Sequence, residues 1–272
     1  MRVLVAADME GVTGVVHWDQ VDPDHGEYGR FRKLMTQDVN AAVEGAYEAG
    51  ADEVFVVDGH AYGRNLLVEA LDPRARLHSG SPSPLSMVTS VETGVEGVLF
   101  VGYHARAGTE RAILDHTWSG SSVTNIWLND RLVGETGINA ALCGHFGAPV
   151  LMVSGDQTLC REAVELLGEV ETAGVKEATG RMAARCLPPE DTRKLIREAA
   201  RRGVTRLLAG EAPEPFRLTS PITLSIEFQK SQMADQAVFL PGARREERRV
   251  SFTAEEMPVI YDALRALLAL AR

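Results

Sequence analysis

The sequence predicts an α/β protein with a mostly parallel sheet and flanking helices, followed by a smaller C-terminal α+β two-layer unit. Short apolar runs alternate with helical segments through the first part of the chain, which is typical of βαβ units. These runs contain few polar positions, as in strands that a parallel sheet buries on both faces. The rhythm changes near Val170, so we expect one domain over residues 1–168 and a second over residues 169–272.

The elements of the first domain follow from apolar periodicity and from stop signals. A helix over residues 31–49 has its apolar side chains on one side and ends at Gly50, and the Asn129-Asp130 pair marks a tight turn. The expected strands cover residues 2–7, 53–58, 95–103, 123–128, 132–133 and 149–154. The other expected helices cover residues 65–71, 135–146 and 158–167.

The second domain mixes strands and helices without this alternation. The expected strands cover residues 172–176, 222–228 and 249–253, and the expected helices cover residues 190–202 and 255–270. A proline-rich connector, EAPEPF, spans residues 211–216. The last helix carries a stripe of apolar side chains at helical spacing, which predicts a packing face.

Composition and charge limit the classes of partner. The 272 residues are 45% apolar, which is enough to bury a core, and their net charge of −10 argues against binding to nucleic acids or anionic membranes. No uncharged apolar stretch reaches the roughly 18 residues of a membrane span, and the first apolar run stops at Asp8, too early for a signal peptide. The three cysteines are widely spaced and form no CxxC motif. We therefore expect a soluble, cytoplasmic protein.

Three of the expected parallel strands end in metal-ligating residue types. The first strand runs into Asp8 and Glu10, the second into Asp58 and His60, and the third into His104. Sites in open α/β sheets form beyond the carboxyl ends of the strands, so neighbouring strands would bring these side chains into one crevice. Asp8 and Glu10 share a face while the chain stays extended. Two carboxylates and two imidazoles are a ligand set suited to Zn²⁺.

Each residue alone also has a structural interpretation. Asp8 by itself is more often a turn residue or a helix cap than a ligand, and His60 or His104 can simply bond to the backbone. The repetition at three strand ends favours a shared ion, because an unpaired charge in a parallel sheet costs several kcal/mol. Two downstream residues stay open at this point. His116 can be a surface-loop histidine, and Glu135 can serve only the dipole of its helix.

Several familiar catalytic signatures are absent from the sequence. It contains no HExxH, no GxxxxGK[ST] and no GxSxG, and no GxGxxG follows the first strand. These absences weaken a nucleotide-cofactor function and give no support to a serine nucleophile.

Five segments of the chain resemble the bacterial D-aminopeptidase family, whose members are dinuclear zinc metallopeptidases of dipeptide-transport operons. The segments are DMEG (8–11), DGH (58–60), GYHARA (102–107), NDRLVGE (129–135) and PVLMVSGD (149–156). PSPLSMV (82–88), RCLP (185–188) and LSIEF (224–228) extend the resemblance over nearly the whole chain in the same order. GYHARA and the NDRLVGE turn are fairly specific, whereas DMEG alone is not.

The resemblance implies two zinc ions per subunit and a division of labour among the ligands. By the family's pattern, Asp8 bridges both ions. Glu10 and His60 complete one site, and His104 and Glu135 complete the other. All five lie in segments that match the family's motifs.

The resemblance also implies a catalytic residue, a substrate and an assembly. The family's catalytic histidine maps to His116, whose role as acid, base or nucleophile the sequence leaves open. The substrate would be a short peptide with a D-amino acid at its N-terminus, and Arg106 is a candidate to bind it. Family members form a ring-like decamer, so a homo-oligomer is expected. The residues alone leave two alternatives: another dinuclear metallohydrolase such as a phosphoesterase, or a non-catalytic peptide- or metal-binding protein of a transport system.

Overall fold

The computed structural model describes residues 1–271, and its largest element is a seven-stranded sheet in the order β3-β2-β1-β4-β7-β8-β9. All neighbouring pairs are parallel except β8 and β9. The strands are β1 (Arg2–Ala7), β2 (Glu53–Asp58), β3 (Ala75–His78), β4 (Gly97–Val101), β7 (Val150–Asp156), β8 (Glu171–Gly180) and β9 (Ala183–Cys186). The predicted mostly parallel sheet is therefore confirmed.

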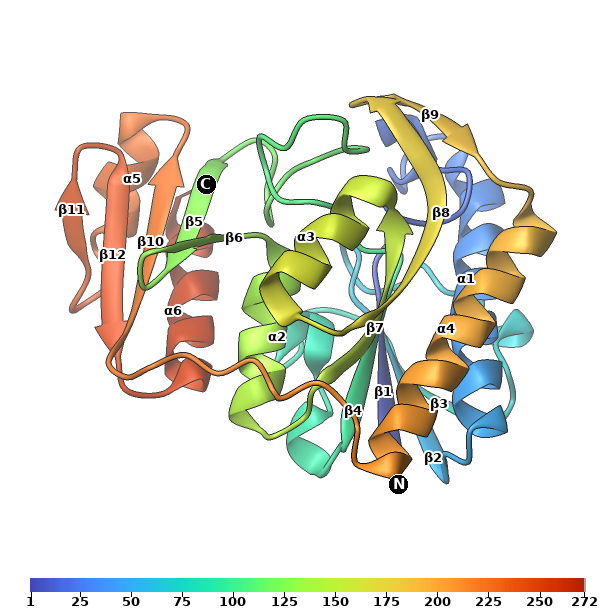
Figure 1. Cartoon of the computed structure of the whole chain (residues 1–272). Helices are drawn as coiled ribbons and strands as arrows, with labels where there is room; N and C mark the ends of the chain where they lie inside the picture. The colour runs from blue at the N-terminus through green and yellow to red at the C-terminus, as the bar shows by residue number, and fades with distance from the viewer. Residues whose placement is uncertain (272) are drawn as a thin grey trace.

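Helices cover both faces of this sheet (Figure 1). On one face lie α1 (Tyr28–Glu48) and α4 (Pro189–Ala209), which pack against each other. The other face meets α2 (Glu135–His145) and the core that continues toward the small sheet, while α3 (Gln157–Leu167) connects β7 to β8. Strand β1 serves both cores by simple alternation, because Val3 and Val5 pack on the α1 side and Leu4 and Ala6 on the opposite side.

A second, five-stranded antiparallel sheet has the order β11-β12-β10-β5-β6. Its strands are β5 (Val123–Leu128), β6 (Arg131–Val133), β10 (Ile222–Phe228), β11 (Arg244–Glu246) and β12 (Arg249–Ala254). Helices α5 (Ser231–Ala237) and α6 (Met257–Leu270) pack against each other and on this sheet. Figure 1 shows this small unit at one end of the molecule, beside α2.

The two sheets do not divide the chain at residue 168. Strands β8 and β9 join the large sheet, whereas β5 and β6 pair with the C-terminal strands of the small one. The βαβ alternation thus continues through α3 into β8. The β5–β6 hairpin leaves the large sheet and pairs with β10 of the small one. Local periodicity predicts that a strand exists, but its partner is a non-local choice.

Some elements differ in type or were not expected. The segment predicted as a helix over residues 65–71 contains only a 3₁₀ turn at Val68–Ala70. Further 3₁₀ turns occur at Trp18–Gln20, Ser86–Val88 and Val91–Thr93. The short strands β3, β9 and β11 and helix α5 were not predicted, because runs of three to seven residues carry too little periodicity. Among the described residues, no helix is long and apolar enough to cross a membrane.

The α1–α4 contact generates a stability prediction. Gly45 lies in α1 where a Cβ atom would overlap the backbone carbonyl of Arg197 in α4. Gly45→Ala should lower the free energy of unfolding by about 1–3 kcal/mol, although alanine is the better helix former. Gly29→Ala is the matched control, since Gly29 lies in the same helix with open space around it. Chemical denaturation measures both, and equal stabilities of the two variants would contradict the close packing.

Candidate metal centre

The carboxyl ends of β2, β1 and β4 lie next to one another and open into a cavity of about 910 Å³. Asp8 and Glu10 follow β1, His60 follows β2 and His104 follows β4. From the sequence, one crevice was expected if these strands were neighbours, and the strand order of the sheet makes them so. Asp8 and Glu10 are 3% and 2% exposed and His104 is 2% exposed, so the cluster is almost entirely withdrawn from solvent.

The two carboxylate oxygens of Asp8 face two different histidines. Oδ1 lies 3.3 Å from Nδ1 of His60, and Oδ2 lies 3.4 Å from Nε2 of His104. Each histidine has a second carboxylate beside it: Oε2 of Glu10 lies 3.1 Å from His60 Nδ1, and Oε1 of Glu135 lies 3.3 Å from His104 Nε2. The site is therefore two histidine–carboxylate pairs that share Asp8.

Backbone carbonyls fix which ring nitrogen each histidine offers to the cluster. His60 Nε2 lies 2.9 Å from the carbonyl oxygen of Val21, and His104 Nδ1 lies 3.0 Å from that of Ala105. A carbonyl oxygen can only accept, so each of these nitrogens carries the hydrogen. The other nitrogen of each neutral ring then presents its lone pair to the carboxylates, which is the arrangement of a metal-ligating histidine.

Three buried polar atoms of the cluster have no hydrogen-bond partner among the described residues: Asp8 Oδ2, Glu10 Oε2 and His104 Nε2. An unsatisfied buried acceptor is costly, so such atoms need an explanation. Carboxylate oxygens and imidazole nitrogens at these separations are ligands for a divalent ion such as Zn²⁺. The residues therefore fit a metal, and the orphaned atoms are the ones that would bind it.

The electrostatics of the cluster also call for a cation. Burial, and then the neighbouring Glu10, raise the pKa of Asp8 to about 7. Burial opposes the charge of His104, but Glu135 and Asp8 raise the pKa of this imidazole to about 10. Protons thus compensate the crowded carboxylates in the protein alone. Divalent cations would supply the same compensation and leave the imidazoles neutral for coordination.

Glu135 and His116 join the cluster from segments that the sequence pattern left open. Glu135 is the first residue of α2, and its Oε1 accepts a 2.7 Å hydrogen bond from the backbone N–H of Trp118. His116 Nε2 lies 3.7 Å from Oε1 of Glu135 and 3.9 Å from Oε1 of Glu10. The His116 ring stacks on His104 with 4.0 Å between centroids. Both residues line the cavity, so the structure brings them to the site.

His116 is held with one nitrogen free to exchange protons. Its Nδ1 lies 2.9 Å from the carbonyl oxygen of Leu114, so this nitrogen donates and Nε2 faces the cavity. Burial, and then His104, lower the pKa of His116. The preceding Asp115 forms an ion pair with Arg181 and accepts from the N–H of Gly108, which anchors the loop. The lowered pKa favours the neutral imidazole, whose Nε2 faces Glu10 and Glu135.

Arg106 lies near the cluster, with its backbone against Gly134, but no contact in the described part of the chain joins its guanidinium to the proposed ligands. It is not part of the cavity lining, and its guanidinium contacts the carbonyl oxygen of Ala107 at 3.4 Å. The backbone N–H of Arg106 donates to Glu162. Its role in substrate binding stays a prediction from the sequence.

Lys176 supports the site and was missed by the sequence analysis. This residue of β8 is 3% exposed, and its ammonium donates to the carbonyl oxygens of Glu10, Val12 and Val15 at 2.7, 2.9 and 2.7 Å. Burial lowers the pKa of Lys176 to about 8, which leaves the ammonium the main form at neutral pH. The strand ETAGVKEATG also contains Glu171, Thr172, Glu177 and Thr179, so a lysine among them gave no distinct signal in the sequence. Its contacts fix the loop that carries Glu10.

Asp58 plays a similar supporting part on the other side of the cluster. Its carboxylate accepts from the backbone N–H groups of Asn65 and Leu66 and from the Asn65 side chain. The Asn65 side chain in turn donates to the carbonyl oxygen of His60. Asp58 therefore closes the loop that presents His60, and its oxygens are already occupied by hydrogen-bond donors.

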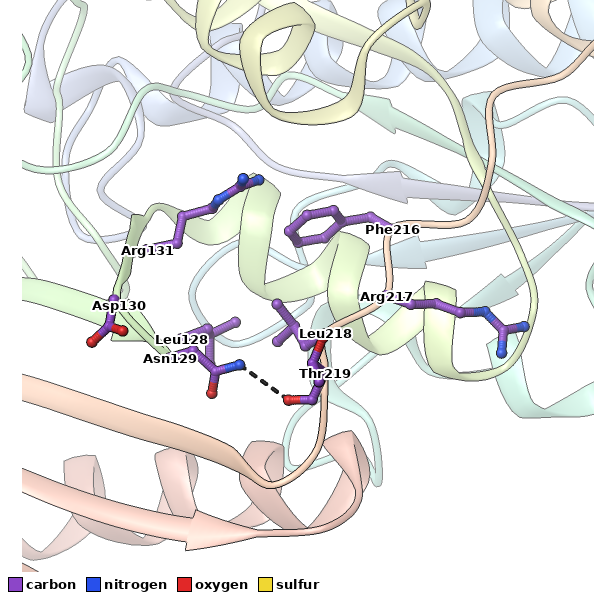
Figure 2. Close-up of a pocket in the computed structure, with 8 residues that line it drawn as sticks. All are labelled: Leu128, Asn129, Asp130, Arg131, Phe216, Arg217, Leu218 and Thr219. Atoms are coloured by element: carbon purple, nitrogen blue, oxygen red, sulfur yellow. Dashed lines mark hydrogen bonds between the residues drawn. The ribbon is translucent and has the colours of Figure 1, made fainter.

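A second cavity, of about 600 Å³, lies at the β5–β6 turn (Figure 2). It is lined by the turn and by residues 216–219 of the connector, and Asn129 donates to the carbonyl oxygen of Thr219 there. Asp130 is the one carboxylate among the described lining residues, and no histidine or cysteine joins it. This cavity lacks the ligand set of the strand-end cluster.

Comparisons with known proteins match the whole chain. A family model described as D-aminopeptidase matches residues 1–266. The "D-aminopeptidase" of Bacillus subtilis (strain 168) is 36% identical over 273 residues, covering 100% of this chain and 98% of that protein. The structure described as "Zn-dependent D-aminopeptidase DppA from Bacillus subtilis, a self-compartmentalizing protease" superposes with a TM-score of 0.95 at 36% identity, covering 100% of this chain and 98% of the other.

The contacts of Lys176 generate a prediction about metal affinity. Lys176→Met leaves three carbonyl oxygens without their donor, so the free energy of unfolding should fall by about 1–3 kcal/mol. The loosened Glu10 loop should also weaken zinc binding by about tenfold, as for other groups that orient metal ligands. Denaturation and competition with a chromophoric chelator measure the two effects. Lys194→Met, an exposed helix position paired with Glu190, is the control. An unchanged zinc affinity would limit Lys176 to a structural role.

Proposed function

This chain belongs to the D-aminopeptidase family, and we propose that it is a zinc aminopeptidase that releases N-terminal D-amino acids from short peptides. The observation that carries the proposal is the carboxylate of Asp8, whose two oxygens face two separate histidine–carboxylate pairs in one cavity. A solved relative with the same fold, which matches this chain over its full length, is described as Zn-dependent. The D configuration of the substrate comes from the name of the family and of that relative.

We further propose that the site takes two zinc ions. Asp8 would contribute one oxygen to each. Glu10 and His60 would complete the first site, and His104 and Glu135 the second. The orphaned atoms of the cluster support this assignment, because each belongs to a proposed ligand. The closely spaced ligand atoms fall into two other groups, one of Asp8, Glu10 and His104 and one of His104, Glu135 and His116, so His60 is in neither. The division of the ligands between the two ions therefore rests on the family resemblance and on the two oxygens of Asp8.

Zinc bound there would lower the pKa of a water molecule and polarise the scissile carbonyl. His116 would do the proton transfer. Its neutral Nε2 faces the cavity and can accept the proton of the attacking water, and the resulting imidazolium can donate it to the leaving amine nitrogen. The stacked His104 and the carbonyl of Leu114 hold the ring in the required orientation. The Trp18 ring makes an edge contact with the His116 ring, with 5.4 Å between centroids.

The size of the cavity and the assembly would limit the substrate. A cavity of about 910 Å³ has the volume of a small-ligand site and admits a short peptide, not a folded chain. The description of the relative as self-compartmentalizing supports a homo-oligomer, and we propose the decameric ring that the family resemblance implies. The three free cysteines fit the reducing cytoplasm, which we propose as the location.

The proposed activity is tested with a chromogenic substrate. The zinc-loaded protein should hydrolyse D-Ala-p-nitroanilide faster than the L-isomer, and a chelator should abolish the activity until zinc is restored. Release of p-nitroaniline gives kcat/KM for each isomer. Activity that survives removal of all zinc would exclude the metallopeptidase mechanism. A preference for the L-isomer would contradict the proposed D-stereospecificity but not the zinc aminopeptidase activity.

The role of His116 is tested by substitution. His116→Ala should lower kcat by about 10²–10⁴, the usual contribution of a general acid–base group, and should leave zinc content unchanged. His145→Ala is the control, because His145 is an exposed residue at the end of α2. Turnover and mass-spectrometric metal analysis are measured together. A parallel loss of zinc in His116→Ala would make this residue a ligand instead.

A further inference from the structure

The wall of the metal cavity that comes from the small unit is cationic. Lys230, which immediately precedes α5, and Arg265 of α6 both line the cavity with the metal ligands. They are its only lysine and arginine among the described lining residues. The only carboxylates in that lining are the proposed ligands Asp8, Glu10 and Glu135. The cavity is thus acidic at the strand ends of the large sheet and basic where the small unit closes it.

Lys230 is free to bind a ligand. Its side chain is exposed, and its ammonium forms no hydrogen bond or ion pair with any residue in the described range 1–271. Arg265 is partly engaged, since it donates to the carbonyl oxygen of Pro84 and lies 3.9 Å from Asp262. Because no carboxylate in residues 1–271 pairs with it, the Lys230 ammonium is available to an anionic group that enters the cavity.

The backbone at Lys230 is anchored by its neighbours, while the side chain itself is exposed. Met233 and Leu268 line the same cavity and pack against the core of the small unit. Helices α5 and α6 also contact each other. The backbone N–H of Gln229 donates to the carbonyl oxygen of Ser122, which ties the start of α5 to the loop before β5. The Lys230 side chain therefore extends from an anchored segment of the cavity wall.

We propose that Lys230 binds the C-terminal carboxylate of the peptide substrate, with Arg265 adding to the positive potential. This inference rests on the proposed function and adds a selection for peptides whose free carboxylate reaches this wall. A short peptide is a zwitterion, and an acidic end and a basic end of one cavity complement it. A peptide that is too long cannot place its N-terminus at the metal ligands and its carboxylate at Lys230 together. The distance from the metal ligands to Lys230 within one subunit would then favour short peptides, independently of the assembly.

The test compares peptides that differ in one charge. The substrates are D-Ala-D-Ala, its C-terminal amide, and D-alanyl-D-glutamic acid α-amide, whose only carboxylate is in the side chain. Lys230→Met should lower kcat/KM for D-Ala-D-Ala about tenfold, as expected for one lost hydrogen bond to a charged group. The effect should be a higher KM with kcat unchanged. The amide should be unaffected. Lys230→Arg should restore most of the loss, and Lys33→Met, at an exposed position outside the cavity, should change nothing.

Three outcomes would overturn the assignment. Equal losses on the acid and the amide would mean general damage to the site, and no loss on either would mean that Lys230 binds no carboxylate. A loss of kcat/KM only on D-alanyl-D-glutamic acid α-amide would mean that Lys230 binds a side-chain carboxylate and not the C-terminal one. Cleavage of the amide by the wild-type protein tests the proposed function separately. If neither peptide is cleaved, titration calorimetry on the zinc-loaded protein still decides, since tighter binding of the acid must disappear in Lys230→Met.

Discussion

The carboxylate of Asp8 is the constraint on which the rest of the site depends. One oxygen faces His60 and the other faces His104, so a single side chain joins the ends of three neighbouring strands. A buried carboxylate beside Glu10 and Glu135 is expensive unless cations or protons compensate it. The raised pKa of Asp8 expresses that cost in the protein alone. The proposed pair of divalent ions would compensate this charge and would also bind the buried polar atoms that lack a partner among the described residues.

Hydrogen bonds from the surrounding structure hold the segments that carry the proposed metal ligands in place. Lys176 fixes the loop after β1, Asp58 closes the loop after β2, and the N–H of Trp118 holds Glu135 at the start of α2. These supports come from segments far apart in the sequence and act through backbone groups. The small sheet adds β5 and β6 before α2, together with the cationic wall at Lys230. The cavity at the strand ends of the large sheet is therefore lined in part by the smaller unit.

The sequence predicted the part of the site that depends on local pattern. Asp8, Glu10, His60 and His104 follow apolar strands, and parallel strands end at one edge of a sheet, so their convergence was predictable. The positions of β5, β6 and β8 were not, because strand pairing between distant segments leaves no local periodicity. Lys176 was missed for the same reason, since its partners lie more than 160 residues away.

Diffraction at the zinc absorption edge tests most directly the proposal that Asp8 would bridge two metal ions. Crystals of the zinc-loaded protein should give two anomalous peaks, one on each side of the Asp8 carboxylate. One peak should lie beside His60 and the other beside His104. A single peak, or peaks away from this carboxylate, would contradict the account.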